Sequence, residues 1–275
     1  MIPSRTQFPP GKDIPATRSR RLVRQEAQRV KSAIAEGRLR LFYQPVVRAD
    51  KMDFVAFYEG LARIEMPDGT IVAAGQFVPF VENTAVGRIL DRKTLEMALL
   101  ALRADPCLRL SVNVSTHSMR DQGWLDMFHT YAGDSGARLI LEITESAAIT
   151  DVEHTTAFLR HVRQFGCSVA LDDFGTGYTS FRYFRDFLFD IVKIDGSFIR
   201  DLPHNPDNRI LVEALTRISR HFDMMTVAEF VETEAEAVMA SDMGVDCLQG
   251  YLFGKPAKAP QPVTACACSA SKSVC

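Results

Sequence analysis

Residues 168–178 read Ser-Val-Ala-Leu-Asp-Asp-Phe-Gly-Thr-Gly-Tyr, an apolar run that ends in two adjacent carboxylates and a glycine-rich turn. A short apolar run bounded by turn residues is typical of a strand buried inside a sheet. Asp172 and Asp173 would repel each other at neutral pH, and burying a carboxylate is costly unless its charge is paired. Either a positive partner neutralises the pair, or the pair lies at the surface, where the cost is small.

Similar apolar runs recur on both sides of this stretch. We expect eight strands, over 39–47, 54–64, 108–114, 138–143, 168–172, 191–194, 225–228 and 245–248. Segments with helical period precede or separate them, at 18–35, 89–104, 151–164, 210–221 and 234–241. This alternation indicates an α/β fold with a mostly parallel sheet buried on both faces. Eight strands in about 250 residues match a closed, TIM-like (β/α)₈ barrel. A doubly wound open sheet is the second interpretation, although no Gly-x-Gly-x-x-Gly motif opens a βα turn.

The composition of the 275-residue chain suits one large domain. Hydrophobic residues make up 47 % of it, which is ample for a packed core, and the formal net charge is −2. That charge argues against a broad surface for DNA or RNA duplexes. We assign 1–17 to a disordered lead-in and 18–258 to the functional domain. The remaining residues, 259–275, form a predicted disordered tail that contains Cys266, Cys268 and Cys275.

Features of membrane and secreted proteins are missing from the sequence. No apolar run approaches the length that crosses a bilayer, and residues 1–5 lead into no apolar segment of a secretory leader. We therefore expect a cytoplasmic protein without membrane insertion. The Cys-x-Cys pair of the tail has no second pair at zinc-finger spacing, so a disordered end is the simpler interpretation.

Polar side chains lie at the carboxyl end of almost every predicted strand. In a parallel barrel these ends open on one rim, so side chains that are distant in sequence converge there. One such residue alone is more simply the solvated start of a loop, but here the pattern repeats from unit to unit. The residues are Glu59, Asn113, Glu142, Asp172, Asp173, Lys193, Asp195, Glu229 and Gln249.

The oxygen-rich set indicates hard cations such as Mg²⁺, Mn²⁺ or Ca²⁺ rather than a thiolate-bound metal. Crowded carboxylates are unstable without cations, so metal ions and an acid cluster explain each other. An adjacent Asp-Asp pair is well placed to hold two ions, with one carboxylate bridging both. Two hard cations close together are the usual means of cleaving a phosphodiester with a metal-activated water. Lys193 would stabilise the developing charge or orient that water.

Other chemistries fit the sequence less well. The six histidines form no His-x-x-x-His or facial-triad spacing, and there is no Gly-x-Ser-x-Gly elbow. A glycosidase with two carboxylates on the same barrel is conceivable, but it would not need the asparagine, the lysine and the surplus of acids. Trp124, the single tryptophan, offers little for sugar stacking.

A series of short motifs in a fixed order runs through most of the chain. The motifs are Tyr43-Gln-Pro-Val46, Glu59-Gly-Leu-Ala-Arg63, Phe77-Val-Pro-Phe-Val-Glu82, Leu110-Ser-Val-Asn-Val-Ser115, Leu141-Glu-Ile-Thr-Glu-Ser146, Asp172-Asp-Phe-Gly-Thr-Gly-Tyr178, Val192-Lys-Ile-Asp195, Ala228-Glu-Phe-Val-Glu-Thr233 and Gln249-Gly-Tyr-Leu-Phe253. On these residues the chain from about Arg18 to Pro256 resembles an EAL domain, the cyclic di-GMP phosphodiesterase module of bacterial second-messenger signalling.

The resemblance implies a β/α barrel whose first strand is antiparallel to the others. It also implies hydrolysis of cyclic di-GMP to linear pGpG with two ions, Mg²⁺ or Mn²⁺. By position in the motifs, the ligands of one ion are Glu59, Asn113, Glu142 and Asp172. Asp172 and Asp173 correspond to ligands of the second ion.

The same resemblance implies roles for the remaining site residues. Lys193 lies near the attacking water, and Glu229 acts as the general base beside the catalytic metal ligand Glu59. Glu145 holds the loop after the Asp-Asp strand, and Gln249 lines the substrate site beside the water and the metal ions. Positions that contact the dinucleotide are Gln44, Leu61 and Arg63, with the Arg63 guanidinium at a phosphate.

Four positions depart from the family pattern. Gly60 replaces the alanine of the signature, Ala62 replaces its second leucine, and Gly196 replaces an arginine after Lys-Ile-Asp. Phe230 replaces a glycine directly after Glu229, and phenylalanine would be strained there if the position requires a positive φ. Phe230 would also narrow the mouth over Glu229, so it bears on activity more than Gly60 does.

We expect a metal-dependent phosphodiesterase, because every position of the metal set is filled. The second interpretation is a receptor that binds cyclic di-GMP and signals through a protein partner without hydrolysis. Sequences of that kind usually lack one of the acids, and this sequence retains them all. A scaffold that acts through protein contacts alone agrees least with the intact acid cluster. We also expect a homodimer, since members of the family commonly pair through barrel helices.

Overall fold

The central feature of the computed structural model, which describes residues 16–175, 187 and 189–263, is a closed ring of eight strands. In ring order the strands are β1 (Leu39–Arg48), β2 (Val55–Glu65), β4 (Leu110–Asn113), β5 (Leu139–Thr144), β6 (Ser168–Phe174), β7 (Ile191–Ile194), β8 (Met225–Ala228) and β9 (Cys247–Gln249). β9 pairs back with β1 and closes the ring.

Strand direction follows the length of the connections. β1 and β2 are joined by a short turn, which permits only an antiparallel pair, and β1 is antiparallel to β9 as well. The neighbouring pairs from β2 round to β9 are all parallel. The predicted (β/α)₈ barrel with an antiparallel first strand is therefore confirmed.

Two details of the sheet differ from the sequence prediction. A further strand, β3 (Ile71–Ala73), pairs antiparallel with the end of β2 and lies outside the ring. Its three residues are too few to show a hydrophobic period, so the sequence carries no signal for it. In addition, β6 continues past the predicted end at 172 to Phe174, which places both aspartates within the strand.

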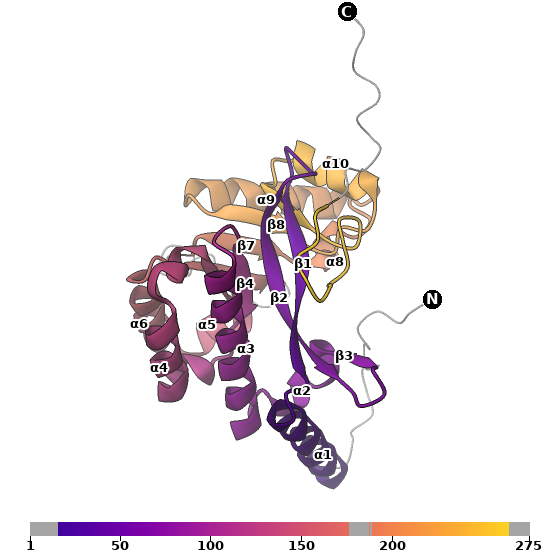
Figure 1. The fold of residues 1–275 in the computed structure, drawn as a ribbon. Coiled ribbons are helices and arrows are strands. Elements are labelled where there is room, and N and C mark those ends of the chain that lie inside the picture. The colour runs from indigo at the N-terminus through magenta and orange to yellow at the C-terminus, as the bar shows by residue number, and fades with distance from the viewer. Residues whose placement is uncertain (1–15, 176–186, 188, 264–275) are drawn as a thin grey trace, which may run out of the picture.

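The described helices lie outside the ring, and all except α1, which precedes β1, come after a strand. They are α1 (Ala16–Ala35), α2 (Val78–Val81), α3 (Ala85–Ala104), α4 (Gln122–Tyr131), α5 (Glu145–Thr150), α6 (Val152–Arg163), α8 (Gly196–Ile199), α9 (Pro206–His221) and α10 (Glu234–Asp242). In Figure 1, α3, α4 and α6 lie together beside the long β1–β2 pair. Capping side chains mark several helix starts; Thr233 and Glu236 form a reciprocal capping box at α10.

The ends of the chain were assigned to a lead-in and a tail. α1 begins at Ala16, within the range given to the lead-in, while residues 1–15 lie outside the described part. At the other end, the Tyr58 hydroxyl donates a hydrogen bond to the carbonyl of Gln261. The tail cysteines at 266, 268 and 275 lie outside the described residues. Within the described residues, none of the helices combines the length and apolarity that crossing a membrane requires.

Candidate functional site

The inside of the barrel is divided into an apolar floor and a polar layer above it. The floor is a buried cluster drawn from strands around the ring, Val46, Phe57, Ile140, Ala170, Ile191, Val227 and Cys247. Side chains two residues apart on a strand share a face, so the next inward position on each parallel strand lies one layer closer to the rim. Those positions are Glu59, Glu142, Asp172, Lys193, Glu229 and Gln249, and on antiparallel β1 the equivalent is Gln44.

Lys193 lies at the centre of the polar layer and is 1 % exposed. Its Nζ lies 2.9 Å from Glu142 Oε2 and 2.9 Å from Glu229 Oε1. It also lies 3.1 Å from Asp172 Oδ1 and 3.8 Å from Glu59 Oε2. One ammonium group thus faces four carboxylates, which leaves the layer with an excess of acidic groups.

Side-chain amides hold Glu59 in place from two sides. Asn113 Nδ2 donates to Glu59 Oε1 at 3.1 Å and contacts Glu142 Oε2 at 3.5 Å. Gln249 Nε2 donates to Glu59 Oε2 at 2.5 Å and lies 3.5 Å from Gln44 Oε1. Closure of the ring between β1 and β9 therefore brings Gln44 beside Gln249, whose amide donates to Glu59. Sequence spacing alone does not predict this contact.

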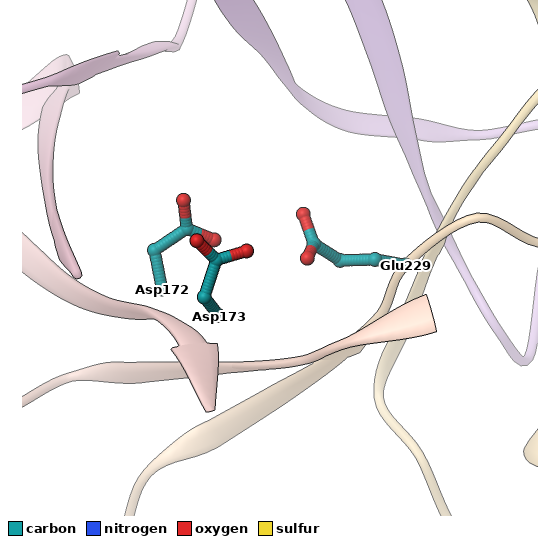
Figure 2. A group of neighbouring side chains, drawn as sticks. All are labelled: Asp172, Asp173 and Glu229. Atoms are coloured by element: carbon teal, nitrogen blue, oxygen red, sulfur yellow. The ribbon is translucent and has the colours of Figure 1, made fainter. Parts of the chain in front are cut away.

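Asp172, Asp173 and Glu229 form the group of side chains that is best placed to hold a metal ion. A carboxylate oxygen from each lies within 4.8 Å of one from each of the others. Figure 2 shows the two aspartate carboxylates side by side, with the carboxylate of Glu229 turned toward them from the neighbouring part of the ring. Three converging carboxylates of this kind are a ligand set for a hard divalent cation.

The backbone at Asp173 explains why two consecutive side chains reach the same site. In a regular strand they would point to opposite faces. Here Asp173 has a φ of 55°, and the pairing of β6 with β7 shifts register between Leu171 and Phe174. A bulge of this kind redirects side chains and is common beside active sites, and aspartate tolerates the left-handed conformation better than most residues.

Burial and neighbouring carboxylates raise the pKa of Glu142 and of Glu229. Burial is the main cause that raises the pKa of Glu142 to about 8; Lys193 opposes the shift, while Glu59 and Asp172 add to it. Burial likewise raises the pKa of Glu229 well above its usual range. Burial alone would lower the pKa of Lys193, but the surrounding carboxylates outweigh it and hold that pKa well above the ordinary value. The layer therefore favours additional positive charge, as protons or as metal ions.

Two buried oxygen atoms support a metal rather than a purely structural network. Within the described part of the chain, Glu142 Oε1 and Gln249 Oε1 have no hydrogen-bond partner. An unsatisfied buried acceptor is unfavourable, and such atoms in a native site call for an additional ligand. The donor chemistry of the layer therefore fits hard cations, which bind carboxylate and amide oxygens.

The other predicted site residues lie around this centre. Leu61 and Arg63 are partly buried on the same side of β2 as Glu59, toward the rim. Burial lowers the pKa of the Arg63 guanidinium, and the Glu59 carboxylate raises it in part. Glu145 Oε2 accepts a hydrogen bond from the backbone N–H of Gly175, the first residue after β6. The loop that Glu145 is predicted to position, from 176 onward, lies outside the described residues.

Asp195 and Ser111 differ from the sequence prediction. Asp195 was included among the converging strand ends, but its carboxylate caps α8 by accepting a hydrogen bond from the N–H of Ser197. Ser111 was missed, although it lies close enough to Glu142 to lower the pKa of that carboxyl in part. It is fully buried. Ser111 lies two residues before Asn113 on β4, so their side chains share a face, and this spacing could have predicted its place near the site.

The comparison with known proteins decides the family. The EAL domain model matches residues 27–256. The chain belongs to the EAL domain family. The family predicted from the motifs is thereby confirmed.

Relatives of this EAL domain are larger proteins with named activities. The chain is 32 % identical over 240 residues to a Pseudomonas aeruginosa protein named bifunctional diguanylate cyclase/cyclic di-GMP phosphodiesterase MucR, covering 84 % of this chain and 35 % of the relative. It is 33 % identical over 239 residues to the cyclic di-GMP phosphodiesterase PdeB of Shewanella oneidensis, covering 84 % and 28 %. This EAL domain thus spans about a third of the length of these relatives.

A solved structure shows the same fold with a ligand. The PaMucR phosphodiesterase in complex with c-di-GMP matches this EAL domain with a TM-score of 0.77 at 31 % identity. The match covers 85 % of this chain and 97 % of the other. An EAL domain protein from Listeria monocytogenes matches with a TM-score of 0.69 at 27 % identity, covering 90 % and 96 %.

Proposed function

We propose that this EAL domain hydrolyses cyclic di-GMP to linear pGpG with two divalent cations, Mg²⁺ or Mn²⁺. The observation that carries the proposal is the buried layer in which Lys193 faces four carboxylates next to the converging Asp172, Asp173 and Glu229. The names of the relatives and the c-di-GMP complex of PaMucR supply the substrate.

The residues of the polar layer would hold the two ions. We assign one ion to Glu59, Asn113, Glu142 and Asp172. The second ion is assigned to Asp172 and Asp173, beside the carboxylate of Glu229. Ions bound there would neutralise the phosphate and lower the pKa of a bound water.

The protein's own groups then position the substrate and move the proton. Water attacks phosphorus, the bond from phosphorus to the 3′ oxygen breaks, and that oxygen takes up a proton to become the 3′ hydroxyl, as a product written pGpG requires. We assign Glu229 as the acceptor of the water proton, because its carboxylate lies beside the aspartates that would hold the second ion. The Lys193 ammonium holds Glu229 at 2.9 Å and opposes the negative charge that develops on phosphate oxygens.

Binding of the dinucleotide is assigned to the rim. Arg63 extends from β2 on the same face as Glu59, and a guanidinium suits two oxygens of one phosphate. Leu61 lies between these two residues on that face, and Gln44 and Gln249 flank Glu59 from β1 and β9. The substrate phosphate would therefore lie between Arg63 and the metal ligands.

A product assay tests the proposal. The purified domain is incubated with cyclic di-GMP and Mg²⁺ or Mn²⁺, with a chelator as the negative control, and pGpG is separated by chromatography. Glu59→Gln should abolish turnover, because it removes a charge from the metal site while keeping the shape of the side chain. Glu213→Gln, on the exposed face of α9, is the matched control and should retain full activity.

Two outcomes would overturn parts of this proposal. Undiminished turnover by Glu59→Gln would refute the metal assignment. Tight binding of cyclic di-GMP without pGpG would refute hydrolysis and support the receptor interpretation.

We also propose, from the family resemblance alone, that the domain forms a homodimer. Sedimentation equilibrium at several concentrations measures its mass. A single monomeric species throughout would refute the dimer.

A further inference from the structure

Phe230 combines a strained backbone with an exposed aromatic ring beside the site. It directly follows Glu229 and has a φ of 56°, in the left-handed region that bulky side chains rarely adopt. Its side chain is nevertheless 39 % exposed, so burial in the core does not account for the residue. Strained residues of this kind persist where the surrounding structure holds them, and they cluster at ligand sites.

Gly196 is the residue that makes room for this ring. A Cβ atom at Gly196 would lie 2.5 Å from Cδ2, 2.6 Å from Cβ and 2.7 Å from Cγ of Phe230. Those distances are shorter than any ordinary carbon contact, so Phe230 lies directly against the Gly196 backbone. The clash of an added Cβ would involve the Cβ of Phe230 as well as its ring. Rotation about the side-chain bonds of Phe230 would therefore not relieve the clash.

The position of this pair on the barrel points to a substrate contact. Gly196 follows β7, which carries Lys193, and Phe230 follows β8, next to Glu229. The contact between Phe230 and Gly196 therefore lies at the carboxyl ends of β7 and β8. β7 supplies the ammonium group, and the residue after β8 is the assigned proton acceptor. The exposed ring belongs to the residue directly after Glu229, whose carboxylate lies close to those of Asp172 and Asp173.

We propose that Phe230 is a substrate-binding residue that stacks against one base of the cyclic dinucleotide. Each phosphate of that substrate lies between two nucleosides, so a phosphate at the metal ligands places planar bases at the surrounding rim. A phenyl ring is a suitable platform for a base, because every base has an aromatic face. The role depends on the function proposed above and adds a recognition element to it.

Three variants separate stacking from packing. Phe230→Leu keeps apolar bulk over Gly196 but removes the aromatic face. Phe230→Tyr keeps the ring and should behave like the wild type. Phe222→Leu is the matched control, because Phe222 is similarly exposed at 37 % but precedes β8, at the opposite end of the barrel.

The readout is the Michaelis constant for cyclic di-GMP together with kcat. Phe230→Leu should raise KM about tenfold while kcat stays within about twofold, which corresponds to roughly 1.4 kcal/mol of lost binding. Phe230→Tyr and Phe222→Leu should leave KM within about twofold of the wild type. If the wild type forms no pGpG, the dissociation constant of cyclic di-GMP in Mg²⁺ replaces KM for the same variants.

Each result distinguishes this role from the proposed reaction. An unchanged KM and dissociation constant for Phe230→Leu would overturn the stacking role and leave hydrolysis standing. An equal loss in Phe230→Leu and Phe230→Tyr would also overturn it, because the effect would then come from packing. A wild type that binds without hydrolysis would refute only the reaction, and one that does not bind would refute both.

Discussion

Replacing Lys193 by methionine would remove the ammonium group around which the polar layer of the barrel is built. The side chain is 1 % exposed and faces carboxylates of Glu142, Glu229, Asp172 and Glu59 at 2.9–3.8 Å. Methionine fills a similar volume, so the change leaves a small cavity at most. Its main effect is therefore electrostatic.

The size of the effect follows from leaving buried acids without a countercharge. Removing one partner of a buried ion pair destabilises a protein by about 3–5 kcal/mol. Uptake of protons by the acids offsets part of this loss, because the pKa of Glu142 is already about 8. We therefore expect Lys193→Met to lower the free energy of unfolding by about 3 kcal/mol in the absence of divalent cations.

Urea unfolding in a chelator measures this difference by linear extrapolation. Repeating the titration in saturating Mg²⁺ should stabilise Lys193→Met more than the wild type, since the ion supplies the missing positive charge. Lys93→Met is the matched control, because Lys93 is 45 % exposed and its ion pair is with Glu96, three residues further along α3. Its effect should stay below about 0.5 kcal/mol. A loss of less than about 1 kcal/mol for Lys193→Met would refute the buried-charge reasoning.

Three further predictions concern pH, packing and metal content. The pKa of Glu142 in the folded protein is about 8, above its ordinary value of 4.5. At a pH between these two values, the folded protein therefore holds a proton that the unfolded chain has released. The urea midpoint of the metal-free protein should therefore fall from pH 5 to pH 8, and Glu142→Gln should flatten the slope; a rising midpoint would contradict the assignment. Gly196→Ala should lower the free energy of unfolding by about 1–3 kcal/mol through its clash with Phe230, and a Phe230→Gly background should remove that loss; strictly additive effects in the double mutant would exclude the contact. Asp173→Ala should reduce bound Mn²⁺, measured by elemental analysis after equilibrium dialysis, from two ions per chain to one, and two retained ions would rule out the assigned ligand.

The strand pattern of the barrel was predictable because each strand carries its own local signal. β7 and β8 begin and end where the sequence predicts, since short apolar runs bounded by polar residues define them. The convergence of Glu142, Lys193 and Glu229 followed from the rule that parallel strand ends share one rim. β3 was missed because three residues show no period.

Features that depend on an irregular backbone were not predictable in the same way. Asp173 joins Asp172 at the site because of its positive φ and a register shift between β6 and β7. The sequence predicts strain at Phe230 if the position requires a positive φ, and the observed φ is 56°. In the sequence, Gly196 and Phe230 are unrelated departures from the family pattern, whereas in the structure the two residues are in contact.

By itself, the sequence determined the barrel class, the family and the identity of the acids at the strand ends, because periodicity and motif spacing are local properties of the chain. Only the tertiary structure decided which groups touch: closure of β1 on β9 brings Gln44 and Gln249 together from 205 residues apart. It also decided the charge balance, because burial raises the pKa of Glu142 and of Glu229, while the surrounding carboxylates hold the pKa of Lys193 above its ordinary value. Distances across the ring depend on closure and bulges, which no local pattern encodes.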